Sequence, residues 1–235
     1  MSLDDHAKVT QAQWLEARKA FLKKEKDFTR MRDELSAARR ALPWVKVEKR
    51  YEFDTTKGKR SLGDLFDGQS QLVVYHFMFD PSWEAGCKSC SFWADNFERN
   101  VVHLAHRDVK MMAISRAPLA KLLAFQKRLG WTFEWASSFE NDFNYDFGAS
   151  FTPEEVASGK VEYNFVKQKA WGTETPGISV FYKDARGDVY RTYSTYSRGL
   201  DMMNAAYHYL DLVPKGRDEG DGNMTWLRLR DSYDE

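Results

Sequence analysis

The sequence is poor in cysteine, carries no excess charge and has no long apolar run. Its 235 residues include only two cysteines, Cys87 and Cys90, which excludes a secreted scaffold stapled by several disulfides. Lysine plus arginine and aspartate plus glutamate number 35 each, so no net charge attracts nucleic acid or anionic lipid. No segment approaches the roughly 20 apolar residues that span a bilayer, and the first residues lack an apolar leader. We therefore expect a cytoplasmic protein without nucleic-acid or membrane partners.

The composition is that of a globular protein. Hydrophobic residues make up 43% and aromatic residues 15%, which is enough for a large core and argues against disorder. At this length a single core can still serve the whole chain. We predict a helical arm over residues 1–42, one domain over residues 43–213 and a C-terminal tail over residues 214–235.

The arm has the pattern of one long helix over residues 10–42, which Pro43 ends because proline lacks an N–H. Large apolar side chains recur there at every seventh position: Trp14, Phe21, Phe28, Leu35 and Leu42. A seven-residue repeat is typical of a helix that lies along another surface. That surface is either the protein's own core or a partner subunit, which would make a homodimer through this helix.

The rest of the chain alternates between strand and helix patterns, which predicts an α/β fold with a parallel sheet. We expect strands at residues 45–53, 72–79, 109–115 and 131–135. Helices are expected at 61–66, from 87 onward, at 118–129 and at 200–212, and a hairpin at 178–193. Residues 137–171 read as an irregular insertion near the active face, with a capped turn at Thr152.

The two cysteines are the best clue to chemistry. They stand in Gly86-Cys87-Lys88-Ser89-Cys90, directly after a buried strand and at the start of a helix. Unpaired N–H groups and the helix dipole favour thiolate there, so Cys87 is predicted to be the attacking thiol. Lys88 adds a nearby positive charge. Cys90, one turn deeper, would resolve the mixed disulfide.

Two other interpretations of the pair stay open at this point. Zinc would require further ligands, and His103 and His106 are the one close histidine pair, placed far from the cysteines. The cysteines could also be chemically idle. We favour a redox dithiol that needs no cofactor and no metal. Its partners would be a disulfide-containing protein or a small thiol, together with a reductant.

Several nearby residues are candidates for supporting roles. Asp80 and Glu84 could act as acid or base for the buried thiol, and Trp83 could form a substrate wall. His76, inside an apolar run, is predicted to be a hydrogen-bonded core histidine. Pro176 precedes a predicted strand and must lie at a strand start, an edge or a turn.

The order of elements over residues 45–212 resembles the thioredoxin fold. Segments such as Tyr75-His-Phe-Met-Phe79, Gly86-Cys-Lys-Ser-Cys90 and Ser115-Arg-Ala-Pro118 resemble a bacterial family catalogued as domain of unknown function 899, described as predicted dithiol-disulfide oxidoreductases. The resemblance implies a thioredoxin-like three-layer sandwich with a cis-proline loop at Thr175-Pro176. That loop would face the dithiol and hold an extended substrate segment. It also implies Cys87 as nucleophile and Cys90 as resolver.

The motif around the cysteines departs from those of thioredoxin and the peroxiredoxins. These departures limit which functional properties the resemblance implies. Thioredoxin reads Trp-Cys-Gly-Pro-Cys, whereas Gly86 precedes the first cysteine here. Residues 125–131 are similar to a region of peroxiredoxins, but those enzymes carry Thr or Ser three positions before the reactive cysteine, where this chain has Glu84. A thiol peroxidase is therefore the second choice. A non-catalytic protein- or metal-binding module on the same scaffold is the alternative from another class.

Overall fold

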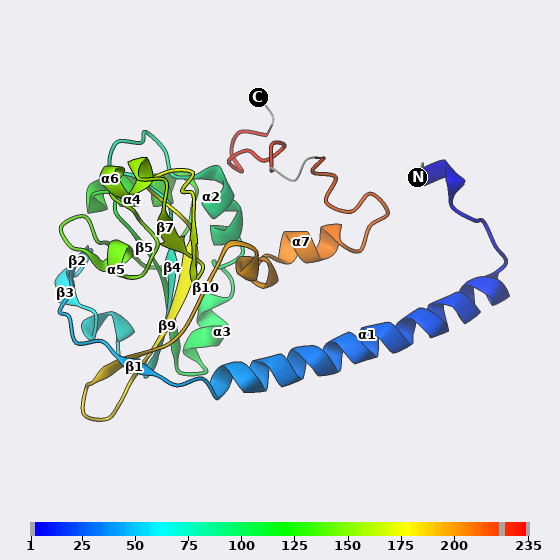
Figure 1. The fold of residues 1–235 in the computed structure, drawn as a ribbon, viewed down its shortest axis with the longest axis horizontal. Helices are drawn as coiled ribbons and strands as arrows, with labels where there is room; N and C mark the ends of the chain where they lie inside the picture. The colour runs from blue at the N-terminus through cyan, green and yellow to red at the C-terminus, as the bar shows by residue number, and fades with distance from the viewer. Residues whose placement is uncertain (1–2, 221–223, 234–235) are drawn as a thin grey trace.

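The computed structural model describes residues 3–220 and 224–233. An eight-stranded mixed sheet forms its centre, in the order β1-β10-β9-β4-β5-β6-β2-β3, and a separate hairpin joins β7 and β8 (Figure 1). The strands are β1 (Val45–Lys46), β2 (Glu52–Thr55), β3 (Gly58–Ser61), β4 (Gln71–His76), β5 (Val109–Ser115), β6 (Trp135–Ser137), β7 (Val161–Tyr163), β8 (Val166–Gln168), β9 (Gly177–Lys183) and β10 (Val189–Tyr196). The helices are α1 (Gln11–Arg40), α2 (Lys88–Ala94), α3 (Val101–Ala105), α4 (Leu119–Arg128), α5 (Phe143–Asp146), α6 (Pro153–Ala157) and α7 (Ala205–Leu210), with 3-10 turns η1 (Leu3–Asp5), η2 (Asp64–Phe66) and η3 (Ser197–Met203).

The middle of the sheet has the topology of the thioredoxin-like fold. Strands β4 and β5 are parallel, and α2 and α3 form the crossover between them. Strand β9 pairs antiparallel with the other side of β4, and β10 pairs antiparallel with β9. The resulting order β10-β9-β4-β5, with a closing helix after β10, confirms the expected fold class.

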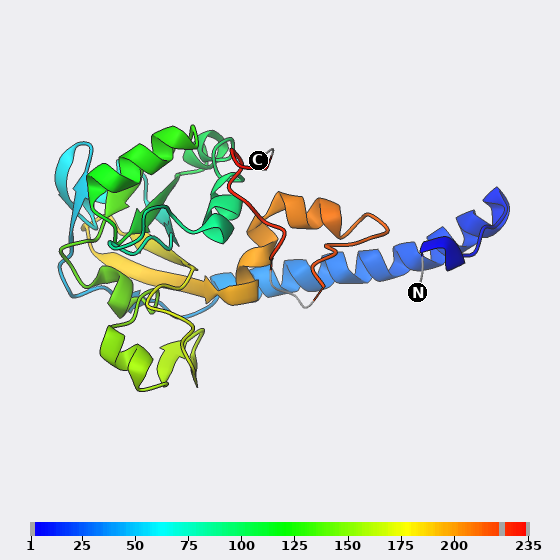
Figure 2. The same cartoon turned by 90° about the horizontal axis from the view of Figure 1, so that it is seen from above.

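The side chains of β4 point alternately to the two faces of the sheet, so the core consists of two layers. Tyr75 and Phe77 face a cluster that includes Trp93 of α2 and Leu122 of α4. Leu72 and Val74 belong to a second cluster across the sheet, which includes residues of α5. Figure 2 shows α4 on one side of the sheet and the insertion that carries α6, β7 and β8 on the other. The sheet is therefore covered on both faces, as its continuous apolar strands predict.

Three predicted elements differ from the structure. Residues 45–53 form two separate strands: β1 pairs with β10 at one edge, and β2 pairs with β3 and β6 near the other edge. Local alternation identifies an extended chain but cannot select its partner strand. The strand expected at 131–135 is confined to β6. The helix expected at 200–212 is split into η3 and α7, because the Asn204 side chain accepts hydrogen bonds from the first N–H groups of α7.

The N-terminal helix α1 does not cover the protein's own core. A capping box between Thr10 and Gln13 starts it, and it ends shortly before Pro43, as predicted. The helix has no buried residue, and Figures 1 and 2 show it extending well beyond the sheet. At its C-terminal end Arg39 lies over the Tyr193 ring, 4.9 Å from its centroid. Among the helices of the described residues, none has the length and apolarity needed to cross a membrane.

Candidate active site

Cys87 occupies the N-cap position of α2, at the end of the loop that follows β4. Its backbone N–H donates to the Met78 carbonyl at 3.1 Å, which ties the loop back to its own start. A Cβ at Gly86 would lie 2.7 Å from the rings of both Phe77 and Phe125, so only glycine fits there. The glycine that replaces thioredoxin's tryptophan therefore allows the backbone before Cys87 to lie directly on the core.

The two cysteines lie 4.1 Å apart, and both are free thiols. Cys87 is partly exposed, whereas the Cys90 side chain is buried in the core with 1% of its surface accessible. The Met78 N–H donates to the Cys90 sulfur at 3.4 Å. Cys87 is therefore the more accessible of the two residues, and Cys90 is the more deeply buried.

The environment separates the acidities of the two thiols. The Cys90 thiol, as a hydrogen-bond donor, is the main cause that lowers the pKa of Cys87 from 9.0 to about 7, and it outweighs the opposing effect of burial. The backbone N–H groups of Cys90 and Ser89 lower it further, as expected at a helix start. Lys88, which is exposed, is not among the main causes. Burial, followed by the neighbouring Cys87, raises the pKa of Cys90 well above its usual value.

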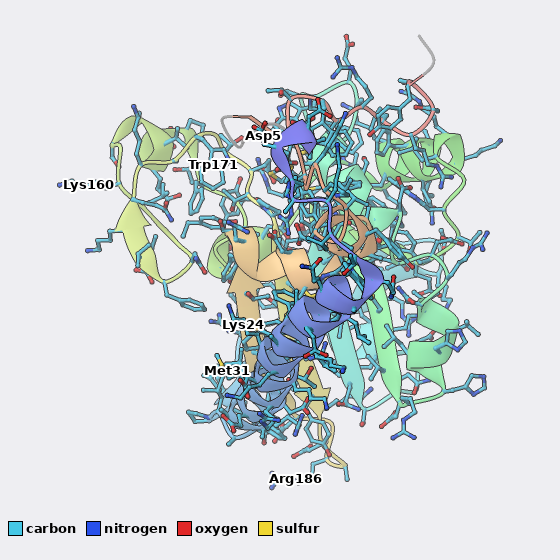
Figure 3. All side chains as sticks on the ribbon, turned by 90° about the vertical axis from the view of Figure 1, so that its right-hand side faces the viewer. Asp5, Lys24, Met31, Lys160, Trp171 and Arg186 are labelled. Atoms are coloured by element: carbon cyan, nitrogen blue, oxygen red, sulfur yellow. The ribbon has the colours of Figure 1, made fainter. Side chains whose placement is uncertain are left out.

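A pocket of about 430 Å³ opens beside Cys90. Ser89 and Pro176 also line it, so Pro176 lies on the same cavity as Cys90, whereas Cys87 is not among the residues that line it. The other walls are mostly apolar and come from β4, α2, β7, the end of the insertion and η3: Tyr75, Met78, Trp93, Tyr163, Trp171 and Leu200. Trp171 is 63% exposed at the rim, and Figure 3 shows it on the insertion that also carries Lys160.

Tyr75 places an unusual polar atom at this pocket. Its side chain is completely buried, and its hydroxyl has no hydrogen-bond partner among the described residues. Burial, and then the neighbouring Cys90, raise the pKa of Tyr75 well above its usual value. A buried hydroxyl without a partner is costly, so this donor is available to a ligand or a thiolate.

The loop before β9 is engaged within the protein. The Thr175 N–H donates to the Ala149 carbonyl at 2.9 Å, and the Tyr163 hydroxyl donates to the Pro176 carbonyl at 2.8 Å. The Thr175–Pro176 bond is trans, so the cis bond implied by the resemblance is wrong for this chain. Trans is the ordinary isomer of an X–Pro bond, and the hydrogen bonds of this loop form with it.

Arg116 joins three segments around the site. Its Nε donates to Glu174 at 2.6 Å and its Nη2 to Asp80 at 2.8 Å, and a further contact reaches the Tyr145 hydroxyl. Glu174 is 3% exposed and also accepts from the Ser150 hydroxyl at 2.9 Å. Burial raises the pKa of Glu174 to about 7, although Arg116 opposes the shift.

The remaining predicted residues lie around the site without lining the pocket. Asp80 is held by Arg116, Ser82 and Thr173. Burial alone would raise its pKa, but the hydrogen bonds from Ser82 and the charge of Arg116 lower it. Glu84 is exposed, and Trp83 packs partly buried against the core.

His76 is a core residue, as predicted. Its Nε2 is 2.9 Å from the Ser179 hydroxyl, its ring stacks on Phe143, and burial lowers its pKa to about 4. The described residues contain no group of three or more His, Cys, Asp or Glu side chains placed to hold a metal ion.

Sequence reasoning missed Tyr75, Arg116, Glu174, Tyr163 and Trp171. Tyr75 had a signal, because it alternates with Phe77 on one face of a fully apolar strand, where a hydroxyl needs a partner. Arg116 and Glu174 lie 58 positions apart, and no pattern in the sequence signals that they pair.

One protein family matches nearly the whole chain. The model of the family described as "Bacterial protein of unknown function (DUF899)" matches residues 3–233. No curated protein matches the chain in sequence. Solved structures that resemble the chain include several peroxiredoxins, each at a TM-score below 0.5.

Three of these structures illustrate the likeness. Peroxidoxin BcpB from Mycobacterium tuberculosis is 15% identical with a TM-score of 0.45, over 70% of this chain and 94% of that one. Peroxiredoxin Q from Xanthomonas campestris is 12% identical with a TM-score of 0.44, over 66% and 87%. A yeast mitochondrial 1-Cys peroxiredoxin is 13% identical with a TM-score of 0.42, over 71% and 76%.

Proposed function

We propose that this chain, which belongs to the DUF899 family of bacterial proteins, is a thioredoxin-like dithiol-disulfide oxidoreductase. One observation carries the proposal: an accessible thiol of lowered pKa lies 4.1 Å from a buried thiol of raised pKa. At neutral pH about half of the Cys87 side chains would be thiolate, which is the nucleophilic form. Cys90 would stay protonated and would stabilise that thiolate by donating a hydrogen bond.

The reaction would proceed in two exchange steps. The Cys87 thiolate attacks one sulfur of a substrate disulfide, forms a mixed disulfide and releases the other sulfur as a thiolate. Cys90 then loses its proton and attacks the Cys87 sulfur, which forms the Cys87–Cys90 disulfide and releases the second substrate thiolate. Each substrate thiolate takes up one proton. The protein is oxidised by two electrons and the substrate is reduced by two, and a dithiol reductant reverses the change on the protein.

The location follows from the same chemistry. A pair that must be reopened after each turnover needs a supply of reductant, which the cytoplasm provides. We therefore place the protein there, as part of the proposal.

Thiol counting on reduced protein tests the proposal. After treatment with excess 2-hydroxyethyl disulfide, the wild type should lose both thiols and gain the mass of an internal disulfide, and dithiothreitol should restore both. Cys87→Ser should react at least tenfold more slowly, because its remaining thiol is buried and protonated. If Cys87→Ser reacts as fast as the wild type, or no internal disulfide forms, the proposal fails.

A further inference from the structure

We propose that the substrate of this site is a small organic disulfide with an apolar body, bound in the pocket beside Cys90, and not an extended segment of another protein. This inference rests on the proposed function, because it names the substrate class for the same dithiol. Three features support it: the backbone pairing of residues 149–151 with residues 173–175, the buried ion pair of Arg116 with Glu174, and the chemistry of the pocket.

The loop that precedes β9 is paired along one side, next to Pro176, with residues 149–151. An extended peptide binds by adding a strand, which requires unpaired N–H and C=O groups. Here the Thr175 N–H donates to Ala149 at 2.9 Å, and the Phe151 N–H donates to the Thr173 carbonyl at 2.8 Å. Ser150 and Glu174 form an antiparallel bridge between these two bonds. Residues 149–151 of the insertion thus already fill one side of this segment, where an added strand could otherwise pair.

This internal strand is anchored firmly. The Ser150 hydroxyl donates to the buried Glu174 carboxylate at 2.9 Å, and Arg116 pairs with the same carboxylate at 2.6 Å. Displacing residues 149–151 would take a partner from a buried, charged side chain, which is costly. A protein substrate would therefore have to break contacts that a small molecule leaves intact.

The pocket has the size and walls of a small-molecule site. Its volume of about 430 Å³ lies within the range of roughly 300–1,000 Å³ typical of such sites. Met78, Trp93 and Leu200 offer apolar surface. At the rim, the exposed Arg198 is paired with Asp201 at 3.2 Å, and Arg217 pairs with the same carboxylate at 2.8 Å.

The Tyr75 hydroxyl supplies a buried donor inside the pocket. It makes no hydrogen bond of normal geometry with the described residues, and it lines the cavity beside the Cys90 sulfur, the group with which it interacts. A donor at that place can hydrogen-bond a substrate sulfur and the thiolate that it becomes. The pocket is therefore complementary to an uncharged body that carries an acceptor sulfur. Cys87 does not line the cavity but lies 4.1 Å from Cys90, so it would attack a substrate sulfur presented beside Cys90, and the two exchange steps are those given above.

The test compares three disulfides on reduced wild type: 4,4′-dithiodipyridine as the neutral aromatic probe, 2-hydroxyethyl disulfide as the small polar one, and insulin as the protein. Each second-order rate is divided by the rate of the same disulfide with dithiothreitol, which removes differences in intrinsic reactivity. We expect the normalised rate for the aromatic probe to exceed that for insulin by about 100-fold. A normalised rate for insulin equal to or above that of the aromatic probe overturns the inference.

Two exposed aromatic residues give a matched pair of variants. Trp171→Ala removes a pocket wall from a side chain that is 63% exposed, so the core stays intact. Its rate with 4,4′-dithiodipyridine should fall about tenfold, while the rate with 2-hydroxyethyl disulfide is unchanged. Phe165→Ala removes a ring that is 61% exposed on the same insertion but does not line the pocket, and it should leave all rates unchanged. No effect of Trp171→Ala, or equal effects of both variants, overturns the inference.

A probe without a reactive bond separates the proposed oxidoreductase function from the assignment of the pocket as the substrate site. Di(4-pyridyl) sulfide has a shape similar to that of the aromatic disulfide but lacks the S–S bond. It should bind to the wild type in calorimetry and at least tenfold more weakly to Trp171→Ala. Binding without any disulfide turnover would contradict the proposed function alone. Turnover without this binding would contradict the pocket assignment alone.

Discussion

The Cys90 thiol is the largest single cause of the lowered pKa of Cys87, from which it is separated by 4.1 Å. Replacing Cys90 by alanine removes this donor, so the pKa of Cys87 should rise from about 7 toward its ordinary value. Cys90→Ser keeps a hydrogen-bond donor, the serine hydroxyl, at the same position and is the matched control. In this variant the pKa of Cys87 should stay near 7. The pH dependence of iodoacetamide alkylation of Cys87 measures both. Identical midpoints in the two variants would contradict this electrostatic account.

The buried carboxylate of Glu174 should make stability depend on pH. Its pKa is 4.5 in an unfolded chain and about 7 in the folded protein, chiefly because of burial. Between these values the unfolded state binds fewer protons than the folded state, so stability falls as pH rises from about 4.5 to about 7. Relative to Glu174→Gln, the wild type should therefore lose unfolding free energy over this window.

Urea unfolding at several pH values measures this difference. Glu162→Gln, which alters an exposed glutamate of the same insertion, is the control and should run parallel to the wild type. If the unfolding free energy of the wild type rises between pH 4.5 and pH 7 relative to that of Glu174→Gln, the effect of Arg116 on the pKa of Glu174 outweighs the effect of burial.

The exposed face of α1 is expected to pair with a second copy of the chain. Trp14, Phe21, Phe28 and Leu35 repeat every seven residues and are 52% to 63% exposed. With these residues at the a positions of a heptad, Asp27 and Glu34 fall at g and Arg32 and Arg39 fall at e, where Glu25 is the acidic exception. In a parallel coiled coil, Asp27 then meets Arg32 of the partner subunit and Glu34 meets Arg39 of the partner subunit. Figure 3 shows Lys24 and Met31, from two successive d positions, along the same helix.

Light scattering tests this association. The wild type should have the mass of a dimer, and Phe28→Glu should be monomeric, whereas Lys26→Glu on the opposite face should remain dimeric. Glu34→Arg should weaken the dimer, and adding Arg39→Glu should restore it. A wild type with the mass of a monomer would remove the proposal.

Hydrogen peroxide should be a poor oxidant of Cys87. The residue three positions earlier is Glu84, which lacks the hydroxyl that Thr or Ser offers at this position as a hydrogen-bond donor to peroxide. Glu84→Thr should raise the rate of peroxide consumption and leave the rate with 2-hydroxyethyl disulfide nearly unchanged. Rapid peroxide consumption by the wild type that Glu84→Thr does not alter would favour the thiol peroxidase alternative instead.

Local patterns in the sequence predicted the local parts of the structure. The apolar run before the cysteines became β4, the alternation after Pro176 became the hairpin β9–β10, and the helix start at Cys87 followed from its neighbours. Each of these features depends on residues close together in the chain. The same holds for the deeper position of Cys90, which lies one helical turn after Cys87.

The parts that could not be predicted depend on distant pairings. The bridge of Ser150 to Glu174 and the ion pair of Arg116 with Glu174 join segments whose sequences carry no matching signal. The division of residues 45–53 between two edges of the sheet has the same cause. These pairings fill one side of the segment beside Pro176, which is one of the observations behind the substrate class that we infer.

Trapping of the mixed disulfide tests the central claim most directly. In Cys90→Ser the second exchange step is blocked, so brief treatment with 2-hydroxyethyl disulfide at pH 7 should leave one mercaptoethanol adduct. Peptide mapping by mass spectrometry should place that adduct on Cys87. The absence of an adduct in Cys90→Ser, or rapid formation of an adduct on Cys90 in the Cys87→Ser protein, would contradict the account.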